Sequence, residues 1–247
     1  MFYDSFIYLV ADGQEWIQMG MRILKNIGNI SPNQSLRDLN VLNNLKAGVR
    51  FVNQTPVIAA LLALAVIINL ATFPIYFGLI SVLAKEVFDS TSTGLGFMMG
   101  TYSLGAVLGS LFAGGRDSSG RIGRFAIGGA FLWSVAIILL ALVPSFIISL
   151  PALFIGGLGQ SICVVSIAMM LLSLTPDNLR GRVMGLRQLA VYSLPLGLLI
   201  SGTIAEILGV RVAILVDGLL GVLLVTVCFM VWPDILKAGA IRERMES

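Results

Sequence analysis

Six long runs of apolar residues fill the chain from residue 56 onward, each separated from the next by a short polar segment. The runs cover residues 56–83, 92–114, 125–143, 146–174, 184–208 and 212–232. About 20 apolar residues, at 1.5 Å of rise each, cross the hydrocarbon core of a bilayer. The runs are continuously apolar and lack the alternation of membrane β-strands. The pattern therefore predicts an all-α membrane protein with six transmembrane helices over residues 56–232.

The first 55 residues are more polar, and two stretches within them show the spacing of amphipathic helices. The stripes consist of Trp16, Met19, Ile23 and Ile27, and of Leu42, Leu45, Val49 and Val52. We expect residues 1–55 to form a cytoplasmic linker-like segment whose helices rest on the membrane surface or on neighbouring loops. Residues 2–10 lack the basic start of a signal peptide and could instead be the end of a preceding span.

Basic residues alternate between the two sides of the predicted spans. Fourteen of the 16 Lys and Arg residues fall before the first span, after the second, around the start of the fifth, or after the sixth. Lys85 and Arg211 fall on the other side. The positive-inside rule then predicts a multi-pass protein of the cell membrane with both termini, including the tail 233–247, in the cytoplasm.

Composition narrows the possible functions. Hydrophobic residues make up 57% of the chain, charged residues 12%, and histidine is absent. Without histidine there is no Ser-His-Asp arrangement, and Cys163 and Cys228 lie inside apolar runs, which argues against a zinc site or a disulfide framework. Gly157 and Gly159 lack the third glycine and the strand context of a dinucleotide loop. We therefore expect no enzyme activity, cofactor or metal, and no nucleic-acid partner, the net charge of +3 being set by membrane topology.

Polar and small residues form stripes at helical spacing within four of the spans. The stripes are Asn69, Thr72 with Phe73, and Tyr76; Met98, Tyr102, Gly105 and Gly109; Gly156, Gln160, Cys163 and Ser166; and Gln188, Tyr192, Pro195, Leu199, Gly202 and Glu206. Such a face turns toward protein or water rather than lipid. It indicates either close helix packing with interhelical hydrogen bonds or a shared water-accessible cavity.

Two carboxylates and three prolines interrupt the apolar runs. Glu206 lies near the end of the fifth run, where it would either form an interfacial ion pair with Arg211 or take part in transport. Asp217 lies deeper and on a different face from Arg211, so it contacts a polar cavity, pairs outside the chain or is protonated. The prolines Pro74, Pro151 and Pro195 each predict an interruption of a span, as in helices that line transport cavities.

Two segments carry a family resemblance. Residues 109–124, Gly-Ser-Leu-Phe-Ala-Gly-Gly-Arg-Asp-Ser-Ser-Gly-Arg-Ile-Gly-Arg, resemble the short basic loop of the major facilitator superfamily, with its acidic residue displaced to Asp117. Residues 175–185, 196–202 and 206–209 are similar to the loop and eleventh span of the branch that contains enterobactin exporters and macrolide-efflux-like proteins. Residues 45–52 resemble the end of that branch's central linker. The resemblance covers residues 45–235 and implies the C-terminal half-bundle of a twelve-span transporter, built from two three-helix inverted repeats.

That resemblance assigns roles to the spans. Spans one and four would line the substrate cavity, spans two and five would form gates, and span six would be peripheral. The substrate-cavity candidates are Asn69, Tyr76, Gln160, Ser161, Gln188 and Tyr192, and the buried-charge candidates are Glu206 and Asp217. The cytoplasmic gate candidates are Arg121, Arg124, Arg180 and Arg182, which could instead only set the topology.

The expected function is export of a small amphipathic compound by alternating access. Major facilitators enclose their site between two six-span halves, so the chain needs a missing N-terminal half or a second chain, in addition to its substrate and the lipid bilayer. The alternative is a non-transporting membrane module, or an inactive transporter fragment that acts as an assembly partner.

Overall fold

The computed structural model describes residues 41–115 and 122–237 of the chain. The chain divides into two compact units, Met1–Asn44 and Leu45–Ser247, and all six candidate spans lie in the second. Every secondary-structure element in the described ranges is a helix. Six helical segments in these ranges are long and apolar enough to cross a bilayer. The all-α, six-span prediction is therefore confirmed.

The observed spans agree with the predicted ones to within four residues except at the start of the fifth, which lies seven residues earlier. They are Pro56–Val87, Ser92–Gly114, Ile122–Leu142, Phe146–Leu174, Asp177–Leu208 and Val210–Val231. The fifth begins at Asp177 rather than at residue 184, because its first two turns are helical but polar. Asp177 Oδ1 and Arg180 Nη1 form an ion pair of 2.6 Å in the first turn, where an acidic residue favours helix formation. A search for apolar runs does not include these polar turns, so it places the start of the span too late.

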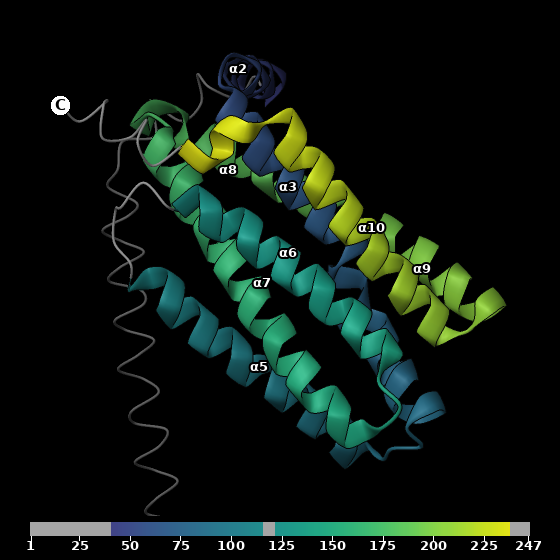
Figure 1. The fold of residues 1–247 in the computed structure, drawn as a ribbon. Helices are drawn as coiled ribbons and strands as arrows, with labels where there is room; N and C mark the ends of the chain where they lie inside the picture. The colour runs from purple at the N-terminus through teal and green to yellow at the C-terminus, as the bar shows by residue number, and fades with distance from the viewer. Residues whose placement is uncertain (1–40, 116–121, 238–247) are drawn as a thin grey trace, which may run out of the picture. The chain divides into compact units, whose positions relative to one another are not determined.

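Four spans are single helices and two are broken (Figure 1). The continuous ones are α5 (Ser92–Gly114), α6 (Ile122–Leu142), α7 (Phe146–Leu174) and α10 (Val210–Val231). Span one consists of α3 (Pro56–Ala71), the π-helical turn η1 (Ile75–Leu79), α4 (Ile80–Val82) and the π-helical turn η2 (Leu83–Val87). Span five consists of α8 (Asp177–Val191) and α9 (Leu194–Leu208). Helix α2 (Val41–Gln54) precedes the spans, and the short helix η3 (Pro233–Lys237) follows them.

The core is centred on α6, which lies between α7 and α10 (Figure 1). Its Trp133 is completely buried. Helices α6 and α7 approach closely at Gly129 and Gly159, since a Cβ on either glycine would meet the other helix's backbone within about 3 Å. Small residues permit this approach between helices in lipid, where packing rather than the hydrophobic effect drives association.

The three prolines differ in their effect on the spans. Pro74 has no N–H to bond the carbonyl of Leu70, and span one leaves its α-helical path there and continues as the π-helical turn η1. Span five breaks at Tyr192 and Ser193, just before Pro195, as the restricted backbone preceding a proline favours. The predicted interruption at Pro151 is wrong, because α7 runs through this residue from Phe146 to Leu174. Pro151 lies in the second turn of α7, close enough to the helix start for the turn to tolerate a lost hydrogen bond.

Helix α2 confirms that a helix precedes span one. Gly48 is buried where a Cβ would touch the Leu186 side chain of α8, whereas Arg50 and Asn53 are exposed. That this helix rests on a membrane surface stays a prediction. The other expected amphipathic helix, with Trp16 at its start, lies outside the described residues, as do Arg116, Asp117 and Arg121 of the basic loop.

Candidate functional site

A cavity of about 180 Å³ lies where the two broken spans meet α7. Most of its walls are apolar, and Asn69 and Arg187 supply the polar groups. An apolar cavity with a few polar groups is the usual form of a small-molecule site. The lining residues are Ala65, Ile68, Asn69, Phe73, Phe77, Val164, Ile167, Arg187, Val191 and Leu194.

The breaks in the two spans border this cavity directly. Phe73 and Phe77 lie on either side of Pro74, and Val191 and Leu194 lie on either side of the interruption in span five. The spans also touch each other here. Ser193 Oγ donates to the carbonyls of Ala190 at 2.7 Å and of Val66 at 3.3 Å. The irregular backbone therefore lies against protein and a cavity, which is where a membrane protein tolerates it.

Asn69 is the cavity candidate that the structure places in the cavity wall. Its side chain is buried, and Nδ2 donates to the Ala65 carbonyl one turn earlier, at 2.8 Å. This bond fixes the orientation of the amide and uses one of its two N–H groups. The second N–H and both acceptor positions of the amide oxygen have no part in this bond. Asn69 can therefore offer further polar contacts to a molecule in the cavity.

Arg187 is a cavity residue that the sequence reasoning missed. It was counted among the charges that set the topology, yet it lines the cavity half-buried from α8. No acidic side chain in the described part of the chain forms an ion pair with it. The signal that could have identified it is its position inside a span, because ionisable residues within a membrane usually have a functional partner.

Tyr76 belongs to an aromatic cluster rather than to the cavity lining. Its ring stacks on that of Tyr102 with centroids 4.0 Å apart, and its hydroxyl faces Gly156 of α7. Trp133 joins the cluster, with its ring 6.0 Å from Tyr76 and 4.8 Å, edge-on, from Phe73. Because Phe73 also lines the cavity, the cluster connects its wall to the core of the bundle.

The other four cavity candidates lie outside the lining. Gln160 and Ser161 are half-buried on α7, with Ser161 Oγ donating to Gln160 Oε1 at 3.4 Å. Gln188 and Tyr192 are exposed, Tyr192 by 69%. The predicted stripe of span five is exposed at every one of its positions: Gln188, Tyr192, Pro195, Leu199, Gly202 and Glu206. Within this chain, that stripe faces outward.

The arginine gate candidates differ in what they contact. Arg180 Nε donates to the carbonyls of Leu172 at 3.1 Å and Thr175 at 3.2 Å, which binds it to the end of α7. A cation there satisfies carbonyls that the helix leaves free. Arg182 is half-buried beside Gly48 of α2, and Arg124 is exposed at the start of α6. Arg121 lies outside the described residues.

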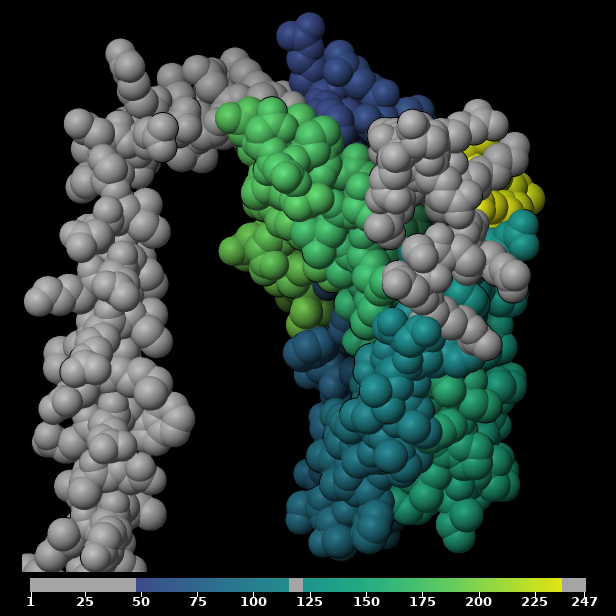
Figure 2. All heavy atoms as spheres, turned by 90° about the vertical axis from the view of Figure 1, so that its left-hand side faces the viewer, coloured from purple at the N-terminus to yellow at the C-terminus, as the bar shows by residue number. Residues whose placement is uncertain are grey.

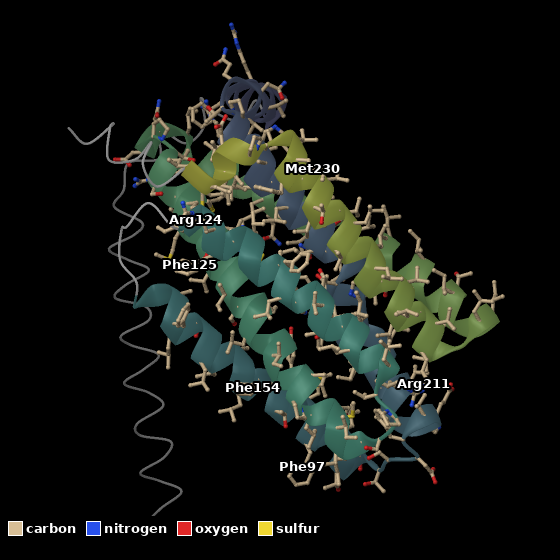
Figure 3. The ribbon with its side chains drawn as sticks, viewed as in Figure 1. Phe97, Arg124, Phe125, Phe154, Arg211 and Met230 are labelled. Atoms are coloured by element: carbon tan, nitrogen blue, oxygen red, sulfur yellow. The ribbon has the colours of Figure 1, made fainter. Side chains whose placement is uncertain are left out.

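Arg211 corrects the expectation of an ion pair with Glu206. Arg211 Nη1 donates instead to the carbonyls of Ala141 at 3.1 Å and Val143 at 2.8 Å, at the end of α6, while Glu206 is exposed. The Arg211 guanidinium satisfies carbonyls that the end of α6 leaves free, whereas an exposed ion pair with Glu206 would contribute little stability. Arg124 and Arg211 lie at opposite ends of the bundle (Figure 3), as the charge pattern required.

Asp217 is buried, with 2% of its surface exposed. Ser201 Oγ of α9 donates to Asp217 Oδ1 at 2.8 Å, and Asp217 Oδ2 has no hydrogen-bond partner. Arg211 is not its partner, in agreement with the sequence reasoning. Over the described residues, no group of three or more His, Cys, Asp or Glu side chains could hold a metal ion.

Six spans, two of them broken beside a cavity with few polar groups, define a multi-pass membrane protein built as solute carriers are. The family model of the Major Facilitator Superfamily matches residues 62–245, so the chain belongs to this family of transporters. It is 28% identical over 202 residues to the multidrug efflux pump Tap of Mycolicibacterium fortuitum, a match that covers 80% of this chain and 48% of the relative. The chain thus spans about half the length of that relative.

Proposed function

We propose that the chain is the C-terminal half of a secondary transporter that exports a small amphipathic compound by alternating access. The observation that carries the proposal is the apolar cavity with Asn69 and Arg187 at the meeting point of two broken spans. Discontinuous spans around a cavity are the recurring site of secondary transporters. The efflux function of the similar protein supports the direction of transport.

The compound that fits this cavity is apolar over most of its surface and carries a group that accepts hydrogen bonds. Phe73, Phe77 and the aliphatic side chains offer apolar contacts, and the Arg187 guanidinium, which forms no ion pair among the described residues, offers several N–H donors. Partial burial removes some of the water around the Arg187 cation, which costs free energy when no partner replaces that water. An electronegative group on the compound would remove that cost, so it would contribute to affinity.

Spans two and five support the need for a second six-span body. Only 17% of the most apolar window of span two and 11% of that of span five is buried, against 61% in span one. Figure 2 shows the side of the molecule where α5, in teal, and α8, in green, reach the surface. We propose that an N-terminal half, or a second chain in its place, covers these faces, and that Arg124, Arg180 and Arg182 lie on the cytoplasmic side with both termini.

Reconstitution tests this function. The full chain would be placed in liposomes alone and together with the part of the Mycolicibacterium fortuitum relative that this chain does not match, and ethidium movement would be followed under an imposed proton gradient. We expect movement in the mixture, reduced several-fold by Asn69→Leu and unchanged by the matched control Asn178→Leu, whose side chain is exposed on α8 outside the cavity.

The alternative is a non-transporting membrane module. It predicts no ethidium movement in any combination, together with equal behaviour of Asn69→Leu and Asn178→Leu in dye binding. That result would overturn the proposal, provided that the chain is shown to be folded in the same vesicles.

A further inference from the structure

Four polar side chains from four spans are buried in the interior of the bundle: Thr72, Ser134, Ser201 and Asp217. Thr72 Oγ1 and Ser134 Oγ donate to carbonyls one turn earlier in their own helices, at 2.7 Å and 2.9 Å. Both lie against Gly221, one turn beyond Asp217 on α10. The bond from Ser201 to Asp217, in contrast, crosses between α9 and α10.

Among the side chains that the structure describes, Asp217 has no charged partner on the elements that pack against α10, namely α3, α6, α9, η1 and η3. The ionisable residues of these elements and of α10 itself are Tyr76, Arg124, Glu206, Arg211, Cys228, Asp234 and Lys237. Arg124, Glu206 and Asp234 are exposed. Arg211 binds the carbonyls at the end of α6, Tyr76 stacks on Tyr102, and Cys228 Sγ lies 3.8 Å from the Ala60 carbonyl.

An ionised carboxylate at this position would be held by one hydroxyl group alone. A buried charge is tolerated in a protein when a counter-charge or several hydrogen-bond donors replace water. Asp217 has one donor on Oδ1 and none on Oδ2 among the described residues. The neutral carboxylic acid is therefore the form that this packing accommodates.

Helix α9 is the element that can expose this group. Its buried residues are Gly197 and Ser201, and its remaining side chains are partly or fully exposed. It begins after the break at Ser193 and ends at Gly209, whose φ of 89° favours glycine. Gly197 rests against the Leu70 carbonyl that Pro74 leaves without a donor. The helix is thus bounded by a break at each end, and its fully buried residues are small, although Ile204 and Ala205 also pack on the core.

We propose that Asp217 is a proton-binding site that couples the position of α9 to protonation. With α9 packed against α10, Asp217 is a neutral acid and accepts the Ser201 hydrogen bond. When α9 moves away and water enters, the Asp217 O–H bond breaks, the proton passes to water, and the carboxylate remains. Ionised Asp217 favours the displaced position because only there can water solvate it. Only the use of this step in transport rests on the proposed function.

Infrared spectroscopy of the full chain in lipid vesicles tests the protonation directly. We expect a carboxylic-acid C=O band at neutral pH that moves when aspartate is labelled with carbon-13, is lost in Asp217→Asn and is unchanged in the matched control Glu206→Gln. Ser201→Ala should raise its frequency, because the C=O group loses a hydrogen bond. Isotope labelling of the wild-type chain needs no variant, so misfolding of Asp217→Asn leaves the test intact.

Absence of an aspartate acid band at neutral pH would overturn the proposal, and so would a band that sodium ions remove at constant pH, since the site would then bind a metal cation.

Coupling is tested by spin labels at Ile207→Cys on α9 and Phe131→Cys on α6, both exposed, with the native cysteines replaced by alanine. The distance should change with pH in the wild-type background and not in Asp217→Asn. A pH-independent distance would overturn the coupling. Neither measurement requires transport, so a failure of the transport function is distinguishable.

Discussion

Two sets of glycines on the same helix differ completely in their surroundings. On α5, Gly105 and Gly109 are buried, and a Cβ on either would collide with the backbone of α7. Gly96 and Gly100, two turns earlier, would meet nothing within 4 Å. Span five repeats the contrast, with Gly197 tight against Leu70 and Gly202 open. The difference separates a packed contact between helices of this chain from an open face, which we propose a second six-span body covers.

The strongest way to sharpen this comparison is to add the same side chain to both kinds of position. Gly105→Leu should lower the free energy of unfolding by about 3 kcal/mol, because overpacking would separate α5 from α7. Gly100→Leu should leave the stability of this chain unchanged. Thermal unfolding in detergent measures both. Equal loss in the two variants would show that the open face is packed in the isolated chain.

The next largest effect on stability is expected at the end of α6, where Arg211 contacts the backbone. Arg211→Met removes the two hydrogen bonds to Ala141 and Val143, so the unfolding free energy should fall by about 2 kcal/mol. Lys85→Met is the control, since Lys85 is exposed and assigned to the same end of the bundle. Identical stability of the Arg211→Met chain and the wild type would mean that these carbonyls are equally well solvated without the guanidinium.

Arg187 lines the cavity and takes part in no ion pair among the described residues, so its loss should affect binding rather than folding. Arg187→Gln should weaken binding of a transported compound about tenfold, because one charge-assisted hydrogen bond contributes roughly 1.5 kcal/mol or more. Arg187→Lys keeps the charge and should retain most of the affinity. Titration of each variant with a transported compound, followed by tryptophan fluorescence, measures whether affinity depends on the positive charge at this position. A stability loss without a change in affinity would assign Arg187 a structural role instead.

The smallest effect is expected at Arg180, which binds the end of α7 from a half-exposed position. Arg180→Ala should lower stability by about 0.5 kcal/mol, since solvent weakens such a helix-end contact. Arg124→Ala, at an exposed position on the same side, should have no effect. If Arg180→Ala lowered the free energy of unfolding as much as Arg211→Met, the contact between the first turn of α8 and the end of α7 would be a major source of stability.

Hydropathy alone predicted the six spans, because a bilayer requires a fixed length of apolar helix. It missed the start of the fifth, where Asp177 and Arg180 build a polar helical turn. The break at Pro74 was predictable because a missing N–H is a local property of the residue. The continuity of α7 through Pro151 was not, since it depends on how near the helix start the residue lies.

The site was less predictable than the fold. Helical spacing identifies which residues share a face, but not which neighbour that face meets. The stripe with Tyr102 and Gly105 therefore packs inside the half, whereas the stripe from Gln188 to Glu206 faces outward. Asn69 was found from its polarity within a span. Arg187 was missed because a positive charge near the start of a span is also expected from the positive-inside rule. Only its position in the cavity wall distinguishes a residue that could contact a ligand from one that merely sets the topology.

The most direct test of the account is thiol labelling of Gly100→Cys and Tyr192→Cys with a maleimide, with and without the part of the Mycolicibacterium fortuitum relative that this chain does not match. Both positions are exposed here, as is Leu223 on α10, where Leu223→Cys serves as the lipid-facing control. We predict that the second half protects the first two positions and leaves Leu223→Cys as reactive as before. Unchanged labelling at all three, with binding of the half verified, would contradict the proposal that these faces await another half.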